Sequence, residues 1–219
     1  MFPVVIIVYN QYTYVRDMVN QLDQMKSIII LDNASTFQPL LDYYKTVKAR
    51  VYHMNVNYGH RVWQRPEIQA MLPEKFIITD PDLRLNPNMP VNYESVLEGL
   101  SEQFKSPRTG LAISLDGPLR TDVKLNNQTI AQWEARFWHH PMLVNGQQTY
   151  FADLDTTFCL INKKYSNMER AWEPGIRVAG DFTCIHRPWM VGWENELMPG
   201  EMEAYMAGNT STNWGKSNA

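Results

Sequence analysis

The chain has 219 residues, of which 44% are hydrophobic and 20% are charged, and its formal net charge is −3 at pH 7. This composition indicates a globular protein with room for one large α/β domain. The mildly acidic balance argues against nucleic acid as a partner, because that partner needs concentrated basic charge. No run reaches the ~20 apolar residues of a transmembrane helix, and the apolar start is too short for a signal peptide. The two cysteines lack metal-ligand spacing, so we expect buried thiols and a cytoplasmic protein.

The first part of the chain alternates between strand-like and helix-like segments. Apolar, β-branched runs predict buried strands at residues 3–8, 27–31, 50–54 and 75–79. Apolar residues at helical spacing predict helices between them, at residues 14–25, 39–47 and 67–72. Because such alternation implies parallel βαβ units, the expected fold class is α/β, with a Rossmann-like, mostly parallel central sheet flanked by helices.

The pattern is less regular in the second part of the chain. We expect a helix at residues 93–104, a strand at 111–115, a helix at 129–138 and strand-like structure over 150–161. Residues 208–219 are rich in Asn, Ser, Thr and Gly and predict a polar tail or linker. We therefore expect one domain over residues 1–207. Its nucleotide-binding half would span about 1–116 and its acceptor and catalytic half about 117–207.

Polar residues gather where the first, second and fourth predicted strands end. Tyr9-Asn10 follows the first strand, Asp32 the second and Asp80-Pro81-Asp82 the fourth. Ligands of α/β folds bind at the carboxyl ends of the strands. Asp80 and Asp82 lie at positions i and i+2, which point to the same side of a strand, so both side chains can bind one ligand. Mg²⁺-type ions take one or two carboxylates together with phosphate oxygens. Asp-Pro-Asp is also ordinary turn chemistry, so a metal site and a pair of solvated turn acids both remain open.

Four motifs together resemble the GT-A nucleotide-sugar glycosyltransferases, most closely the inverting enzymes of the family-2 type. They are Val5-Ile6-Ile7-Val8-Tyr9-Asn10-Gln11, Leu31-Asp32-Asn33-Ala34-Ser35, Asn55-Val56-Asn57-Tyr58-Gly59 and the Asp-x-Asp motif in Thr79-Asp80-Pro81-Asp82. The resemblance covers residues 3–90 well and the remainder loosely. The chain also resembles the amino-terminal domain of chlorella-virus glycosyltransferases. This would make the protein viral, place it in the host cytoplasm and connect it to further domains of a longer chain.

The resemblance implies a binding site for a UDP-sugar donor. Tyr9 and Asn10 would line the pocket for the base, and Asp32 would accept a hydrogen bond from the base or the ribose. Asn57 and Arg61 would lie near the base and the diphosphate, where the arginine contributes a fixed positive charge.

The resemblance also implies a metal cofactor. Asp82 would bind the metal directly, and Asp80 would reach the ribose or a metal-bound water. His186 would be a further metal ligand, because many metal-dependent GT-A enzymes close this site with a histidine from the later part of the chain. A mixed set of carboxylate and imidazole ligands suits Mn²⁺, with Mg²⁺ as the alternative.

An inverting transfer needs a general base that takes the proton of the acceptor hydroxyl. Family members place an acidic residue for this role well downstream of the Asp-x-Asp motif, and the candidates here are Asp153, Asp155 and Asp181. Asp155 is preferred, because it stands in an otherwise apolar predicted strand where a charge needs a purpose or a partner. Asp181 is the second choice. The Glu-Asp pair of family-2 enzymes is absent at both places.

The predicted function is a metal-dependent, inverting hexosyltransferase that passes a hexose or deoxyhexose from a UDP-sugar to a saccharide hydroxyl in glycan synthesis. Trp133, Trp138 and His140 are candidates for an acceptor wall, although a packed subdomain explains them equally well. One alternative is a nucleotide-sugar-binding or degenerate transferase domain without turnover. A sugar-nucleotide pyrophosphorylase would need a Gly-rich first loop, which Tyr9-Asn10-Gln11-Tyr12 lacks, and a haloacid-dehalogenase-type phosphatase usually carries Asp-x-Asp on its first strand.

Overall fold

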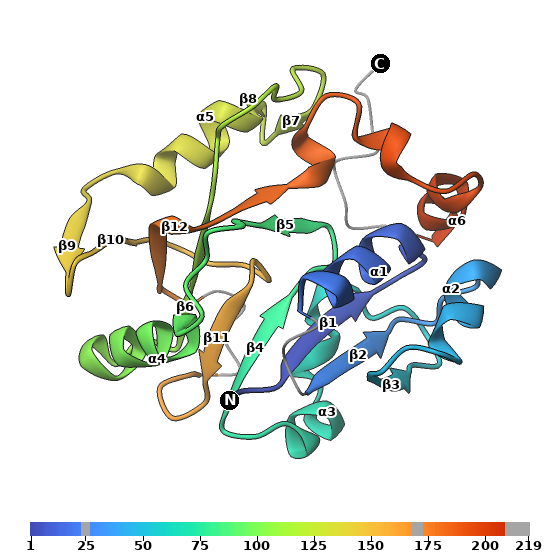
Figure 1. Cartoon of the computed structure of the whole chain (residues 1–219), viewed down its shortest axis with the longest axis horizontal. Coiled ribbons are helices and arrows are strands. Elements are labelled where there is room, and N and C mark those ends of the chain that lie inside the picture. Colours follow the sequence, from blue (N-terminus) through green and yellow to red (C-terminus); the bar gives the residue numbers. More distant parts are fainter. Residues whose placement is uncertain (23–26, 168–172, 209–219) are drawn as a thin grey trace.

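A computed structural model of the chain describes residues 1–22, 27–167 and 173–208 (Figure 1). The predicted polar tail lies outside these residues except for Gly208. Within this part of the chain no helix is long and apolar enough to cross a membrane.

The first four predicted strands form one parallel block of the central sheet. They are β1 (Val4–Val8), β2 (Ile28–Asp32), β3 (Arg50–His53) and β4 (Lys75–Thr79), and their order in space is β3-β2-β1-β4. All three pairings in this block are parallel. Every residue of β1 is buried, because helices cover both faces of the sheet there. This confirms the expected α/β class with a mostly parallel central sheet flanked by helices.

The sheet continues through strands from the later part of the chain. These are β11 (Cys159–Asn162), β6 (Arg108–Ile113), β12 (Gly175–His186), β10 (Gln147–Phe151) and β9 (Met142–Val144), in that spatial order beyond β4. β11 runs antiparallel to both β4 and β6, and β6 is parallel to β12. The short strand β5 (Leu83–Leu85) pairs with the end of β12. A separate small hairpin consists of β7 (Lys124–Leu125) and β8 (Gln128–Thr129).

Helices cover the two faces of the parallel block in different ways. On one face, α1 (Tyr12–Gln21), α2 (Gln38–Tyr44) and α4 (Tyr93–Phe104) contribute apolar side chains to the larger core. On the other face, the 3₁₀ helix η1 (Gly59–Gln64) and α3 (Pro66–Met71) pack against alternate residues of β1 and β4. Each large apolar side chain buried in this way stabilises the fold by about 1.5–3 kcal/mol.

Beyond β6 the chain forms short helices around the sheet edge. α5 (Ile130–Ala135) begins at a capping box made by Thr129 and Gln132 and runs on into the 3₁₀ helix η2 (Arg136–Trp138). After β12 come η3 (Arg187–Trp189), η4 (Trp193–Glu196) and the last helix, α6 (Glu201–Gly208). α6 lies near α1 and α2 in Figure 1.

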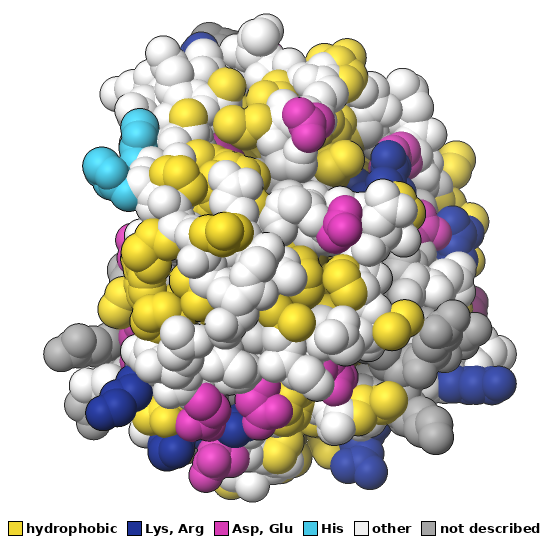
Figure 2. Space-filling model, turned by 60° about the vertical axis from the view of Figure 1, so that its left-hand side comes forward, with side chains coloured by type: hydrophobic (Ala, Val, Ile, Leu, Met, Phe, Trp, Pro, Cys, Tyr) yellow, Lys and Arg dark blue, Asp and Glu magenta, His cyan; other side chains and the backbone are white. Residues whose placement is uncertain are grey.

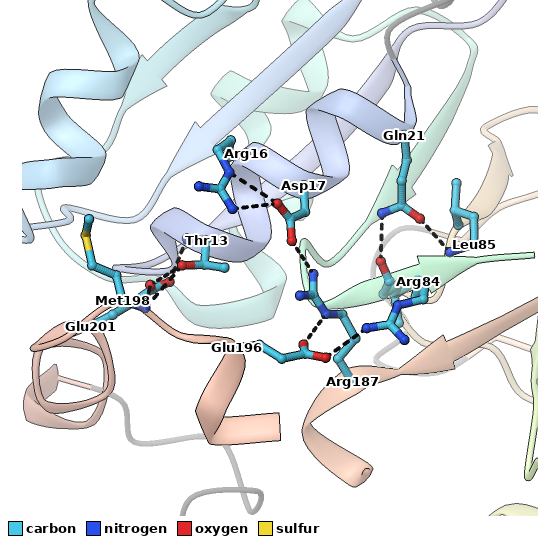
Figure 3. A network of polar contacts seen from close by, with 11 residues as sticks. Thr13, Arg16, Asp17, Gln21, Arg84, Leu85, Arg187, Glu196, Met198 and Glu201 are labelled. Atoms are coloured by element: carbon cyan, nitrogen blue, oxygen red, sulfur yellow. Dashed lines mark hydrogen bonds and ion pairs between the residues drawn. The ribbon is translucent and has the colours of Figure 1, made fainter. Parts of the chain in front are cut away.

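A polar network ties this last segment to α1 (Figure 3). Arg187 pairs with Asp17 at 3.1 Å and with Glu196 at 2.7 Å, and Arg84 of β5 also reaches Glu196, at 2.8 Å. Gln21 bonds both Leu83 O and Leu85 N of β5, at 3.1 and 2.8 Å. The network therefore fixes β5 and the end of β12 against α1.

The hairpin of β9 and β10 exposes apolar side chains. Leu143 is 78% exposed and Phe151 is 52% exposed. Figure 2 brings this side of the molecule forward and shows hydrophobic side chains across its middle, with acidic side chains grouped below them.

Two local predictions are wrong. The strand expected at 111–115 is shifted: β6 begins at Arg108 and ends at Ile113, because its polar and small residues are buried between β11 and β12. The expected strand-like stretch 150–161 is two strands joined by an irregular segment, residues 152–158, and Asp155 belongs to that segment.

Candidate active site

Two adjoining cavities lie where β1 and β4 end. The first has a volume of about 200 Å³, and six of the predicted site residues line it: Tyr9, Asn57, Asp80, Asp82, Asp155 and His186. The second has a volume of about 430 Å³ and lies against α5, η2 and β12. Asp80, Asp155 and His186 line both cavities. These three residues therefore mark the boundary between the two spaces.

Asp80 leaves β4 at the centre of an acidic cluster. Its backbone N–H donates to Thr156 O at 2.9 Å, and its carboxylate accepts from the Thr156 hydroxyl. Burial raises the pKa of Asp80 well above its usual range, and the neighbouring charges of Asp82 and Asp155 raise it further. The structure thus concentrates three carboxylates in one partly buried space.

Asp82 and His186 face each other across the same space. Asp82 Oδ2 lies 3.6 Å from His186 Nε2, and β5 and β12 bring the two residues together because Leu83 pairs with His186. Among the described residues, neither Asp82 Oδ1 nor His186 Nδ1 has a hydrogen-bond partner, although both atoms are buried. Burial lowers the pKa of His186, against the opposite effects of Asp82 and Asp155.

The two side chains supply donor types that a divalent cation binds, although the atoms that face each other are Asp82 Oδ2 and His186 Nε2 and not the unpartnered pair. Buried polar atoms normally have partners, and carboxylate oxygen together with imidazole nitrogen is a donor set that Mn²⁺ accepts. Over the described ranges, no three His, Cys, Asp or Glu side chains converge closely enough to form a complete metal site.

The last helix, α6, covers the part of the first cavity where the base of a nucleotide was predicted. Tyr205 lines this cavity, and its ring centroid lies 6.2 Å from that of Tyr9. Asn57 Nδ2 donates to Gly208 O at 3.4 Å. Asn10 lines neither cavity: its Nδ2 donates to Ala204 O at 2.8 Å. Its Oδ1 accepts from two backbone N–H groups at the start of α2, so Asn10 joins α2 to α6.

Asp32 is buried and does not line the first cavity. Its carboxylate accepts from the Tyr44 hydroxyl at 3.0 Å and from Ser35 N at 3.3 Å, and it lies 3.2 Å from His53 Nδ1. Burial raises the pKa of the Tyr44 hydroxyl, and the Asp32 charge adds to the shift. The next residue, Asn33, lines the cavity instead.

Arg61 and Asp181 lie apart from the other predicted residues. Arg61 is on η1 and exposed, and Asp181 is exposed in β12 where the pairing with β6 shifts register between Val178 and Thr183. Neither lines either cavity.

The second cavity combines aromatic and charged side chains. Trp133 and Phe137 of α5 and η2 line it together with Trp189, and Arg136 lies over the Trp133 ring at 3.4 Å. Trp138 does not line it but packs on Tyr150 with ring centroids 5.2 Å apart, and His140 is exposed elsewhere.

Several lining residues were not predicted from the sequence. Asn33 stood inside a quoted motif, so its position after the second strand could have identified it. Thr156 and Arg177 lie on segments that supplied other candidates, Asp155 and His186, but nothing in the sequence singled them out, and Tyr205 lies on a segment without such a candidate.

The sheet order, with a cavity at the carboxyl ends of β1 and β4, defines an α/β fold that a solved structure shares. The mannosyltransferase PcManGT from Pyrobaculum calidifontis, solved in complex with GDP-Man and Mn²⁺, shares this fold with a TM-score of 0.52. Its identity is 10%, over 89% of this chain and 59% of that chain. At this identity the likeness shows a shared fold alone. TarS of S. aureus, residues 1–349, has a TM-score of 0.41 at 14% identity, over 94% of this chain and 55% of that chain, and carries no argument.

The chain spans less than two thirds of the length of both structures, 59% and 55%. No family model matches the sequence, and no curated protein matches it.

Proposed function

We propose that the chain is a metal-dependent, inverting glycosyltransferase that transfers a hexose or deoxyhexose from a UDP-sugar to a saccharide hydroxyl. The observation that carries this proposal is the pair of adjoining cavities that share Asp80, Asp155 and His186. A group transfer between two substrates needs two binding spaces that meet at the reacting atoms, because proximity and orientation supply much of the rate.

The first cavity is the donor side in this proposal. Tyr9 and Asn57 line it directly. Asn10 and Asp32 do not line it: Asn10 bonds the start of α2 and α6, and Asp32 bonds Tyr44 of α2. Arg61 is assigned to the diphosphate end by resemblance alone, since it is exposed on η1. The GDP-Man and Mn²⁺ of the mannosyltransferase belong to that protein, so a guanine donor is a second candidate to test here.

Asp82 and His186 would hold the divalent cation, with Asp80 beside them. The carboxylate oxygen and imidazole nitrogen with which the two side chains face each other support this assignment. When bound, such a cation acts as a Lewis acid that neutralises the diphosphate leaving group, help worth several kcal/mol.

Asp155 is proposed as the general base. It stands at the boundary of the two cavities, where an acceptor hydroxyl from the second would meet a donor sugar in the first. In the proposed step, the Asp155 carboxylate takes the hydroxyl proton as the acceptor oxygen bonds to the anomeric carbon. The bond from that carbon to the diphosphate breaks, and the electron pair leaves with the diphosphate. Asp181 remains the second choice, and its place outside both cavities favours Asp155.

The second cavity is the acceptor side. Its Trp133, Phe137 and Trp189 can stack on the C–H faces of a sugar ring, and Asp153 can accept from hydroxyls. The proposed domain organisation follows the same division: residues 1–116 supply most of the donor side, and residues 117–207 supply the acceptor wall, Asp155 and His186.

Turnover of nucleotide sugars tests the function. The protein is incubated with UDP- and GDP-sugars, Mn²⁺ and simple glycoside acceptors, and nucleotide release and glycoside products are measured. A transferase forms product and slowly hydrolyses the donor without an acceptor. The competing function, a nucleotide-sugar-binding domain without turnover, is favoured by the contacts of α6 with Asn10 and Asn57. Such a domain binds the nucleotide but releases no product.

A further inference from the structure

The irregular segment 152–158, which carries Asp155, is held by two buried arginines. Arg108 of β6 donates from Nη1 to Leu154 O at 2.9 Å, and Arg177 of β12 donates from Nε to Asp153 O at 2.8 Å. Both arginine side chains are 5% exposed. Two successive carbonyls just before Asp155 are therefore fixed from two different strands of the sheet.

Each arginine also faces a buried glutamate. Arg177 Nη1 pairs with Glu134 of α5, whose side chain is 1% exposed. Arg108 Nε lies 3.8 Å from Glu173, whose side chain is 5% exposed. A planar guanidinium bonds a carboxylate and a carbonyl in directions that its rigid fork of donors fixes, a geometry that the compact ammonium of a lysine does not reproduce. The arginines are thereby held in place from behind while they bond the segment.

The end of the segment packs closely on the sheet. At Gly110 of β6 a Cβ atom would lie 2.4 Å from the Cβ of Cys159, the first residue of β11, and 2.8 Å from Phe158 O, the last carbonyl of the segment. On its far side, Thr156 O accepts from Asp80 N at 2.9 Å. Three carbonyls between Asp153 and Thr156 thus accept N–H bonds, and the fourth, Asp155 O, lies 3.5 Å from Cys159 Sγ.

We propose that Arg108 and Arg177 are positioning residues that hold the Asp155 carboxylate at the boundary between the two cavities. The inference rests on the proposed function, which makes Asp155 the general base. Arg177 also lines the second cavity, but the role proposed here acts through the backbone of residues 153–154 for both arginines. A misplacement of a reacting group by about 1 Å can cost on the order of 100-fold in rate, so a loop that carries a base gains from such restraints.

The test compares Arg177→Met with a matched control, Lys163→Met. Lys163 Nζ also bonds two backbone carbonyls, Gln69 O and Leu72 O, both at 2.7 Å. Neither of these residues, nor Lys163 itself, lines either cavity. We expect Arg177→Met to lower kcat for transfer by about 10- to 100-fold while the KM for the donor changes less than about threefold. Lys163→Met should lower thermal stability and leave kcat within about twofold.

A double variant separates positioning from general destabilisation. If Arg177 acts through Asp155, Arg177→Met combined with Asp155→Asn should be no slower than Asp155→Asn alone. Arg177→Lys and Arg108→Lys should fold and retain part of kcat, which keeps the test open if Arg177→Met fails to fold. Additive losses in the double variant, or a full wild-type kcat in Arg177→Met, would overturn the proposal.

Amide hydrogen exchange of the peptide 152–158 gives a readout that needs no activity. Exchange there should rise at least tenfold in Arg177→Lys and stay unchanged in Lys163→Met. If the wild type transfers no sugar from any donor, the proposed function fails and this measurement alone decides the restraint. Unchanged exchange in Arg177→Lys overturns the restraint whatever the activity.

Discussion

The first cavity is lined by acidic side chains that no Lys or Arg in its described lining neutralises. Asp80, Asp82 and Asp155 line it, and no Lys or Arg is among its described lining residues. A diphosphate would add further negative charge, so a cation has to accompany it. We expect Asp82→Ala to weaken UDP binding in the presence of Mn²⁺ by at least about tenfold, which corresponds to about 1.4 kcal/mol.

Isothermal titration of UDP with Mn²⁺ and with EDTA measures this effect. Asp153→Asn is the matched control, because Asp153 belongs to the same acidic region but lines only the second cavity. Equal UDP affinity in wild type and Asp82→Ala, with and without EDTA, would remove the metal assignment.

Single substitutions at Asp155 and Asp181 decide which of the two residues is the general base. Asp155→Asn keeps the size of the side chain but cannot take a proton, so donor binding should persist while kcat for transfer falls by about 10²–10⁴-fold. Asp181→Asn should change kcat little, because Asp181 lines neither cavity. Steady-state kinetics of both variants provide the measurement, and the opposite ranking of the two would move the base to Asp181.

Glu134 makes the stability of the fold depend on pH. Burial raises its pKa to about 7 from a model-peptide value of 4.5, although Arg177 acts in the opposite direction. The folded state therefore holds the proton more tightly than the unfolded state. The stability from this group is fully present below pH 4.5 and is lost as pH rises through about 7.

Urea unfolding of wild type and Glu134→Gln at pH 5 and pH 8 checks this sign. The variant cannot ionise at this position, so its free energy of unfolding should fall less between the two pH values than that of the wild type. A larger fall in the variant would contradict the assignment of the pH dependence to Glu134.

At the scale of elements, α6 limits access to the donor side. The first cavity measures about 200 Å³, below the roughly 300–1,000 Å³ of typical ligand pockets. α6 is anchored by Glu201, whose carboxylate accepts from Thr13 N at 2.8 Å and from Thr13 Oγ1 at 2.6 Å. The proposed nucleotide would have to displace α6, and its apparent affinity would then be reduced in proportion to the fraction of molecules in which the pocket is open.

Loosening this anchor should raise nucleotide affinity. We expect Glu201→Ala to bind UDP about three- to tenfold more tightly and to melt at a lower temperature, since a buried bonded carboxylate is lost. Glu203→Ala is the control, because Glu203 is exposed on the same helix. Weaker UDP binding in Glu201→Ala would show that α6 supports the bound nucleotide rather than excluding it.

The elements also show what could be predicted from the sequence. The strands β1, β2 and β4 were predicted because strands covered on both faces are continuous apolar runs, and α4 because its apolar residues keep one helical face. The place of Asp80 and Asp82 followed from the end of β4. The same reasoning identified the motif positions of Asn10 and Asp32 but could not show that their side chains turn inward to bond α2, α6 and Tyr44.

What could not be predicted depends on contacts between distant segments. Asp155 lies where it does because Arg108 and Arg177 bond the carbonyls of an irregular segment, and such bonds leave no periodic pattern. Likewise β12 contains polar and small residues that form a strand only because β6 and β10 pair with it.

In the whole molecule, one sheet joins the donor and acceptor sides. β11, from the later part of the chain, inserts between β4 and β6 and starts directly after the segment that carries Asp155. The boundary near residue 116 therefore separates two proposed roles and not two sheets. Asp80 at the end of β4 and Thr156 before β11 meet because of this insertion.

Because the site forms only when the whole sheet is assembled, a ligand that fills it should stabilise the entire chain. Binding to the folded state alone adds RT ln(1 + [L]/Kd), about 2.7 kcal/mol at 100 times Kd. For a chain of 219 residues this corresponds to a rise in melting temperature of about 5–10 °C. We expect UDP with Mn²⁺ to give this shift, and EDTA to abolish it.

A thermal-shift panel of UDP, GDP, CDP and their sugars, each with Mn²⁺ and with EDTA, provides the measurement, and Asp82→Ala is the control that keeps the fold. A shift with GDP but not UDP would show that the donor nucleotide carries guanine and not uracil, and the proposed metal site and transferase activity would stand. The absence of any nucleotide shift in the wild type would reject the donor site, because a nucleotide that binds only the folded state at 100 times its Kd must raise the melting temperature.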